Sequence, residues 1–381
     1  MSSIAAAATT ATTLEERNAI RDAVRDLMAA RSSEAAVRAT MDSAEGYDPE
    51  VWAALVEMGI PGLLVVAEFG GAGFGPLEVE LVMEETGAAL LCSPLVSSGV
   101  LAAALLARSG DLEACERLLP GIAAGSTIAT VALTGEAGTW TPAGVDVIAG
   151  VAGGGPFLDG VASYVTHGQI ATALLVVART PDGIGIFEVV PGAAGLTIAP
   201  LPTFDRTLRL ARLEFSRTPA HRIGAAGWPA VESALRVALV ALGGEQVGGA
   251  RRIFEMTLEY AKVRVQFGRA IGGFQAIKHM AADLLLEVES ATSAARDAAQ
   301  QLAEGSKTAG EAVSLAAFVC ADAFSNVAAT AIQMHGGIAF TWEHPAHLYL
   351  RRARALAQLF GTPQFYRERF LRHLAPDDKW P

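Results

Sequence analysis

Residues 264–283 read RVQFGRAIGGFQAIKHMAAD, and this stretch decides the fold. It begins with an arginine and a Phe-Gly pair, continues through Gly272 and Gly273, and then places apolar residues at helical spacing from Phe274 to Asp283. Glycine pairs interrupt regular structure, whereas a 3.6-residue period is typical of an amphipathic helix. The stretch therefore predicts a turn that opens a helix.

Helical periodicity extends on both sides of this turn. It runs from Pro229 to about Lys262, from Phe274 to Ala303 and from Ala309 to Met334, and shorter segments follow Pro345. Because these segments are long and closely spaced, we expect a helical bundle over residues 225–381.

The first part of the chain also predicts helices. Thr13 followed by Glu16 has the pattern of a capping box, the Asp48-Pro49 pair marks a second helix start, and Pro76 marks a third. Residues 90–107 form a long apolar stretch interrupted by a proline and serines, which indicates a buried helix and not a membrane span. We expect a helical domain over residues 14–122, preceded by a disordered tail, not a signal peptide, over residues 1–13.

The middle of the chain has a different texture. β-branched runs such as Ala173 to Val177 and Ile184 to Val190 are separated by Gly and Pro clusters, which is typical of short strands. Residues 123–224 should therefore form a small β domain. The order helical, β, helical predicts an α+β protein and leaves little room for a doubly wound sheet.

Composition narrows the possible partners. The 381-residue chain has a formal net charge of −11, which argues against a nucleic acid. Charged residues make up 18% and the mean hydropathy is +0.35, so we expect surfaces hidden between subunits. Cys92, Cys115 and Cys320 are odd in number and widely spaced, as expected of reduced core thiols in a cytoplasmic protein. His335, His344 and His347 have no acidic ligand at metal-binding spacing, so no metal is expected.

A second motif, QMHGGIAFT at Gln333 to Thr341, follows the first. Together the two motifs resemble the C-terminal signatures of acyl-CoA dehydrogenases. AEFGGAG at residues 67–73 and SYVTHG at residues 163–168 are similar to that family's early E-x-G-G-x-G turn and its W-I-T-N-G strand. The resemblance covers nearly the whole chain in the same order. It implies a helical N-terminal domain, a small β barrel or sandwich, a C-terminal four-helix bundle and bound FAD.

The resemblance also implies roles for individual residues in holding FAD. Thr134 matches the threonine beside the pyrimidine edge, Thr166 the hydroxyl near flavin N5, and Tyr164 the aromatic on the ring. Residues that receive the ADP half of a neighbouring subunit's FAD are matched by Arg264, Phe267, Gln333, Gly336 and Gly337, and further cofactor contacts by Thr362 and Gln364. An arginine fork suits a diphosphate, and paired glycines let the backbone approach closely.

The chain departs from the family at two places. The loop after Thr134 is one residue shorter than usual, which affects the substrate contact expected from Thr139. The family's usual base is a glutamate in Y-E-G-T, and an ungapped count puts Phe360, in LFGTP, at that position. Phe360 keeps its main-chain N–H, which matches the donor that binds the thioester oxygen in the family.

A second location for the base in this family is the helix before the first signature. Residues 237–250 contain one charged residue, Glu245, and an isolated carboxylate is costly in apolar surroundings. Gly248 and Gly249 lie on the same helical face and could leave space for flavin or a bulky acyl group. We therefore expect Glu245 to be the base. The alternative is that the glycines serve close helix packing and Glu245 bonds a neighbouring group.

The resemblance then implies FAD-dependent α,β-dehydrogenation of an acyl-CoA to the trans-2-enoyl-CoA, with a branched or steroid-derived acyl group favoured. Glu245 would take the α proton and flavin N5 the β hydride. The alternatives are a non-catalytic partner subunit of a heteromeric acyl-CoA dehydrogenase and a flavin oxidase or monooxygenase. Expected partners are an acyl-CoA, electron-transfer flavoprotein or a similar acceptor, and further subunits in a homotetramer or heterotetramer.

Overall fold

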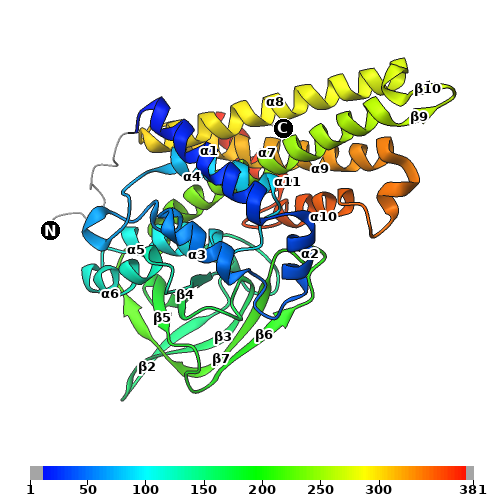
Figure 1. Ribbon diagram of the computed structural model, residues 1–381. Coiled ribbons are helices and arrows are strands. Elements are labelled where there is room, and N and C mark those ends of the chain that lie inside the picture. Colours follow the sequence, from blue (N-terminus) through cyan, green and yellow to red (C-terminus); the bar gives the residue numbers. More distant parts are fainter. Residues whose placement is uncertain (1–11, 375–381) are drawn as a thin grey trace. The chain divides into compact units, whose positions relative to one another are not determined.

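The computed structural model describes residues 12–374, whose contacts group into two compact units. Unit 1 contains residues 39–75 and 92–238, and unit 2 contains residues 13–38, 76–91 and 239–374. Helix α7 (Gly227–Val263) passes from unit 1 into unit 2 after Ala238. Figure 1 traces the order of the elements along the chain.

Unit 1 is built around one largely antiparallel sheet (Figure 1). Its strand order is β6-β7-β3-β2-β4-β5-β8, and β1 pairs with β4 in parallel. The strands are β1 (Ala129–Ala132), β2 (Ile148–Ala152), β3 (Gly155–Thr166), β4 (Ala173–Thr180), β5 (Gly183–Val189), β6 (Leu196–Leu201), β7 (Leu210–Pro219) and β8 (His221–Ile223). The two runs expected to be strands are confirmed as β4 and β5.

The buried side chains of this sheet form one apolar core. Leu158 on β3, Leu174 on β4 and Leu213 on β7 are fully buried within it. Alternate residues of a strand point to opposite faces, so these strands contribute every second side chain. The core holds β3 firmly, which matters because two residues expected to contact flavin lie at its end.

Helix α3 of unit 1 begins where the sequence predicts. The Asp48 side chain caps α3 (Pro49–Glu57) by accepting from the backbone N–H of Glu50 and Val51. The long apolar stretch forms a buried π-helix (Val96–Ala102) that continues into α5 (Ala103–Arg108), and α6 (Leu112–Ala123) follows. The buried helix expected within residues 90–107 is therefore confirmed from Val96 onward, after a turn.

Unit 2 consists of helices. Its elements are α1 (Leu14–Arg31), most of α2 (Glu34–Asp42), α4 (Pro76–Ala88), the larger part of α7, α8 (Gln275–Ala303), α9 (Ala309–His335), α10 (Ala346–Leu356) and α11 (Pro363–Leu374). The predicted capping box is present, with Thr13 and Glu16 bonding each other's backbone at the start of α1. Helix α9 packs against α8, α10 and α11, as expected of a bundle.

Helices α4 and α7 approach each other through glycines. A Cβ on Gly248 would overlap the carbonyl oxygen of Glu84, and one on Gly244 would overlap that of Glu80. In return, a Cβ on Gly87 of α4 would overlap the backbone of Glu245 on α7. Such mutual contact brings the two backbones closer than any side chain would allow.

Helix α4 carries four buried glutamates, which most helices could not tolerate. Arg251 on α7 binds both Glu84 and Glu85, Arg296 on α8 binds Glu84 at 3.3 Å, and Arg25 on α1 binds Glu85 at 2.9 Å. These ion pairs hold three helices to α4.

Glu80 differs from the other glutamates of α4. Its side chain is buried, and within residues 12–374 its Oε1 atom has no hydrogen-bond partner. Burial and the nearby Glu84 raise the pKa of Glu80 to about 8, although Arg296, Arg251 and Arg21 oppose the shift. Glu80 is therefore mostly protonated at neutral pH.

The cysteines lie in the core. Cys92, Cys115 and Cys320 are buried free thiols, as predicted, and burial raises the pKa of Cys115 to about 11.

The three-domain boundaries stay a prediction; the compact units divide the N-terminal helices between them. Residues 1–11 of the expected tail lie outside the described residues. Residues 309–340 form a helix long and apolar enough to span a membrane by length and composition, so the expected absence of a span also stays a prediction.

The glycine contact can be tested by adding a single methyl group. Gly248→Ala should lower the free energy of unfolding by about 1–3 kcal/mol, because the Glu84 backbone cannot move aside without shifting α4. Gly243→Ala is the matched control on the same helix, since its Cβ would meet the nearest side chain at 3.7 Å. That control should raise stability by about 0.5–1 kcal/mol. If urea denaturation gave the same change in the free energy of unfolding for Gly248→Ala and Gly243→Ala, the packing role of Gly248 would be contradicted.

The buried Glu80 predicts a pH dependence. Its folded-state pKa of about 8 exceeds the ordinary 4.5, so the folded state binds the proton more tightly and stability falls as pH rises from about 4.5 to 8. Each pKa unit corresponds to about 1.4 kcal/mol. Glu80→Gln should weaken the dependence of the free energy of unfolding on pH, and above pH 8 the variant should be more stable than the parent. Glu57→Gln, an exposed change, should keep the pH dependence of the parent. Urea denaturation at pH 6 and pH 9 measures it, and parallel slopes would contradict the prediction.

Candidate functional site

Two of the residues expected to contact flavin sit beside a bulge in β3. The β3–β7 register shifts between Ala162 and Val165, and Tyr164 inside the shift has a positive φ of 57°. The bulge turns Tyr164 outward, where its ring is 37% exposed. Its hydroxyl donates to the carbonyl of Glu136 at 3.1 Å, which ties the ring to the loop after β1.

The hydroxyls expected along the flavin edge are buried. Thr134 is 1% exposed and donates to the carbonyl of Thr139 at 2.8 Å. Thr166 is also buried, and its carbonyl accepts a 2.5 Å bond from the Thr130 hydroxyl. Unit 1 thus brings Thr134, Thr139 and Tyr164 together through one loop. Thr139, expected on the substrate side, is exposed but uses its carbonyl to hold that loop.

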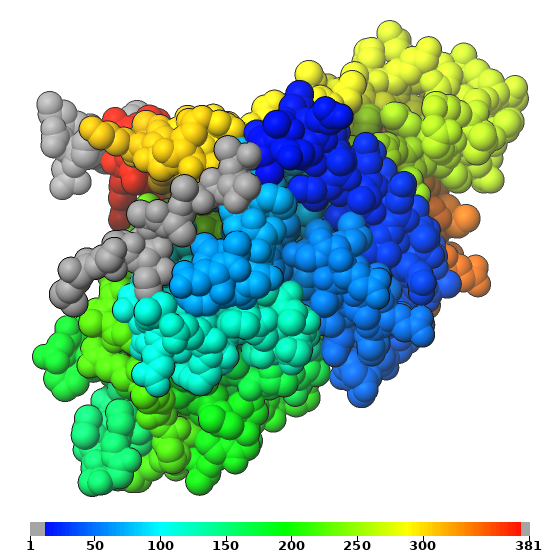
Figure 2. Space-filling model, turned by 60° about the vertical axis from the view of Figure 1, so that its left-hand side comes forward, coloured from blue at the N-terminus to red at the C-terminus, as the bar shows by residue number. Residues whose placement is uncertain are grey.

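Unit 2 presents a different set, and all of its members are exposed. The hairpin of β9 (Val265–Gln266) and β10 (Arg269–Ala270) turns at Phe267 and Gly268, which both have positive φ. Phe267 is 91% exposed, and the Arg264 side chain is exposed at the end of α7. The yellow-green end of α7 and α8, with this hairpin, lies on the surface in Figure 2.

The second signature caps α9. Gln333 is exposed in the last turn, and Gly336 ends the helix with a φ of 69°. Neither Gly336 nor Gly337 has an atom within 4 Å of where a Cβ would stand, so this backbone is open. Tyr260 of α7 joins the two signatures, because its ring stacks on His335 at 4.5 Å and its hydroxyl donates to the His335 carbonyl at 3.3 Å.

The histidines of this region make ordinary bonds. Nδ1 of His335 bonds the carbonyl of Ala331 at 2.8 Å, and Nε2 of His347 bonds that of Trp342 at 3.3 Å. Burial lowers the pKa of His335, so its ring is neutral at physiological pH. Within residues 12–374 there is no cluster of three or more His, Cys, Asp or Glu side chains that could hold a metal ion.

Glu245 lies inside unit 2 and has a cationic partner. Its side chain is 6% exposed and forms an ion pair with Arg352 of α10, which is 5% exposed. A second nitrogen of Arg352 donates to the carbonyl of Leu91 at 3.2 Å. Arg352 is therefore buried together with its carboxylate partner. The geometry favours the structural interpretation of Glu245.

The expected ligand space beside Glu245 is filled by the protein itself. Gly248 faces the backbone of Glu84, and a Cβ on Gly249 would overlap the ring of Phe324 on α9. The prediction that Gly248 and Gly249 leave room for flavin or an acyl group is therefore wrong for this structure. They serve close helix packing, because protein atoms occupy the face that they expose.

Phe360 lies in the turn between α10 and α11. It is 2% exposed with a φ of 62°, an uncommon conformation for a bulky residue. The Tyr366 hydroxyl donates to its carbonyl at 2.5 Å and so fixes the turn. The expected cofactor contacts beyond it bond locally: the Thr362 hydroxyl accepts from the N–H of Phe365, and Gln364 donates to Glu368.

The two sets of residues differ in how well they fit FAD. An open glycine backbone beside an exposed arginine and an exposed aromatic ring suits a dinucleotide's diphosphate and adenine. Arg264, Phe267, Gly336 and Gly337 have these properties individually, so the chemistry of the unit 2 set fits the ADP half of FAD. In unit 1 the threonines are less accessible: Thr134 and Thr166 are buried, and the Thr134 hydroxyl donates to the Thr139 carbonyl.

The sequence falls into known domain families. Residues 14–126 match the acyl-CoA dehydrogenase N-terminal domain, and residues 225–375 match the acyl-CoA dehydrogenase C-terminal domain. Among curated relatives, acyl-CoA dehydrogenase IpdE2 of Mycobacterium tuberculosis is 36% identical over 352 residues, which is 92% of this chain and 94% of the relative.

Solved structures agree. The ChsE4-ChsE5 complex from Mycobacterium tuberculosis provides a chain that is 31% identical, with a TM-score of 0.87 over 97% of this chain and 99% of that one. A Tcur3481-Tcur3483 steroid ACAD variant is 29% identical, with a TM-score of 0.87 over 95% and 98% of the two chains. The chain therefore belongs to the acyl-CoA dehydrogenase family, whose members are FAD-dependent oxidoreductases.

Proposed function

We propose that this chain is the partner subunit of a heteromeric acyl-CoA dehydrogenase, and that the base for α-proton removal lies on a related second chain. The buried ion pair between Glu245 and Arg352 is the observation that carries the proposal. A general base must reach the substrate's α carbon and release its proton again. A carboxylate held by a buried guanidinium is poorly suited to both tasks.

Phe360 supports the same conclusion. It stands where most family members carry the base, and a phenyl ring cannot accept a proton. The ring is buried, and the Tyr366 hydroxyl fixes the backbone of this turn by bonding the Phe360 carbonyl, so the side chain at this position supplies no carboxylate. Its backbone N–H, expected as a donor to the thioester oxygen, would be of use only with a base elsewhere.

In this arrangement the chain contributes the exposed set of unit 2 to the FAD of its partner. Arg264 would bind the diphosphate, while Phe267 and the open backbone at Gly336 and Gly337 would cover the adenosine. When bound, FAD accepts the hydride that leaves the β carbon of the acyl group. Gln333 supplies an amide at the same end of unit 2.

The proposed substrate class rests on the similar solved structures. One similar structure is named as a steroid ACAD, and each of the two similar structures is named for two proteins. We therefore favour a steroid-derived or branched acyl-CoA and a heterotetramer. Electron-transfer flavoprotein or a similar acceptor, and a cytoplasmic location, complete the proposal.

The role of Glu245 can be separated from catalysis by pairing two substitutions. Glu245→Gln leaves the Arg352 charge buried without its partner and should lower the free energy of unfolding by about 3–5 kcal/mol. The double variant Glu245→Gln with Arg352→Met should recover most of that loss. Thermal and urea denaturation measure stability, and acceptor-linked turnover of the assembled enzyme measures activity.

A catalytic role would give the opposite pattern. Glu245→Gln would then fold like the parent and lose turnover by several orders of magnitude, and Arg352→Met would not restore it. The proposal instead requires turnover per folded enzyme to change less than tenfold in the double variant. Arg354→Gln, an exposed change on the same helix as Arg352, controls for lost surface charge.

The chain purified alone gives a second test. It should carry little flavin absorbance and show no flavin reduction with any acyl-CoA, because it lacks a base and presents mainly the ADP half of the site. Co-expression with its partner should restore both. A yellow protein that dehydrogenates acyl-CoA by itself would support the alternative of an active homotetramer, and oxygen consumption by reduced flavin would indicate an oxidase.

A further inference from the structure

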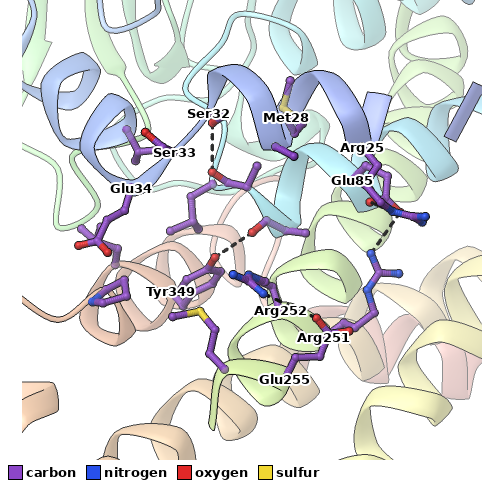
Figure 3. A pocket seen from close by; sticks show the side chains of 18 residues that line it. Arg25, Met28, Ser32, Ser33, Glu34, Glu85, Arg251, Arg252, Glu255 and Tyr349 are labelled. Carbon is purple, nitrogen blue, oxygen red and sulfur yellow. Dashed lines mark hydrogen bonds and ion pairs between the residues drawn. The ribbon is translucent and has the colours of Figure 1, made fainter. Parts of the chain in front are cut away.

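Unit 2 contains a cleft that no part of the proposed function uses. It has a volume of about 810 Å³ and lies among α1, α2, α4, α7 and α10 (Figure 3). Ligand pockets of proteins commonly have volumes of roughly 300–1,000 Å³. None of the residues expected to bind FAD or substrate lines it. The cleft therefore needs its own explanation.

One part of the cleft is apolar. Met28 of α1, Val37 of α2 and Leu348 of α10 line it, and each is at most 4% exposed. They come from segments far apart in sequence, so the apolar lining is a product of the fold. Such a surface holds a compact hydrocarbon body by removing it from water.

The polar part has an uneven distribution of charge. Arg251 binds Glu84 and Glu85, and Arg25 binds Glu85, so these charges neutralise one another. Glu34 pairs with Arg38 at 2.8 Å. The remaining lining arginine, Arg252, has a weaker partner.

Arg252 is poised beside a fixed hydroxyl. Its side chain is 51% exposed and lies 4.0 Å from Glu255, at the limit of an ion pair. It lies beside buried Tyr349, whose hydroxyl donates to the Ala88 carbonyl at 2.8 Å. Figure 3 shows Arg252 and Tyr349 side by side in the cleft. A guanidinium of this kind can bind a carboxylate through two parallel bonds.

We propose that this cleft binds a small amphipathic carboxylate, with Arg252 holding the acid group and Met28, Val37 and Leu348 contacting its apolar body. The site is separate from the FAD-binding set and does not depend on the partner-subunit proposal. The acid binds whether or not this chain has a base of its own.

Calorimetric titration of the full chain with decanoate tests the proposal. Decan-1-ol, which has the apolar chain without the carboxylate, and inorganic phosphate, which has negative charge without the chain, are the control ligands. Decanoate should bind at least tenfold more tightly than decan-1-ol or phosphate. Arg252→Gln should weaken decanoate binding at least tenfold, because it removes the charged fork. Arg354→Gln, an exposed change on α10, should leave it unchanged.

Three results would overturn the proposal. They are no decanoate binding by the parent chain, equal binding by the Arg252→Gln variant, and phosphate binding as tight as that of decanoate. The same titration on the assembled enzyme adds a fourth. If assembly abolishes binding, the cleft is a subunit contact and not a ligand site. Because Arg252 is half exposed, its substitution should not impair folding, and a thermal scan checks this.

Discussion

The close contact between α4 and α7 is the constraint on which unit 2 depends. Gly87, Gly244 and Gly248 let the two backbones touch, and this contact places the glutamates of α4 beside α7. Buried carboxylates require cations, and Arg25, Arg251 and Arg296 supply them from three surrounding helices. Packing and charge pairing are therefore coupled, so a change in one disturbs the other.

The Glu245–Arg352 pair extends the same design to α10. Glu245 lies on α7 where Gly87 of α4 touches its backbone, and Arg352 reaches both Glu245 and the carbonyl of Leu91. One arginine thus connects α10, α7 and the segment that follows α4. This structural role of Arg352 and Glu245 makes Glu245 a poor candidate for proton transfer and supports the proposal that the base lies on a partner chain.

The sequence predicted the elements well because their signals are local. Caps at Thr13 and Asp48 mark helix starts, since a side-chain oxygen near a helix start has few other uses. The flavin signatures were found for a related reason: turns at Phe267 and Gly336 need particular backbone conformations. The role of Glu245 was harder to predict, because its partner lies 107 residues away. The glycines around it fit a ligand space and a helix contact equally well until the structure showed Glu84 and Phe324 in that space.

The proposed role of this chain is to supply half of a flavin site through the exposed Arg264, Phe267, Gly336 and Gly337, while buried Phe360 stands where most family members are expected to carry the base. Native mass spectrometry of the assembled enzyme tests that claim most directly, because it counts chains and FAD molecules in one particle. The account predicts a heteromer with one FAD for each pair of unlike chains. A homotetramer of this chain with one FAD in every subunit would contradict it.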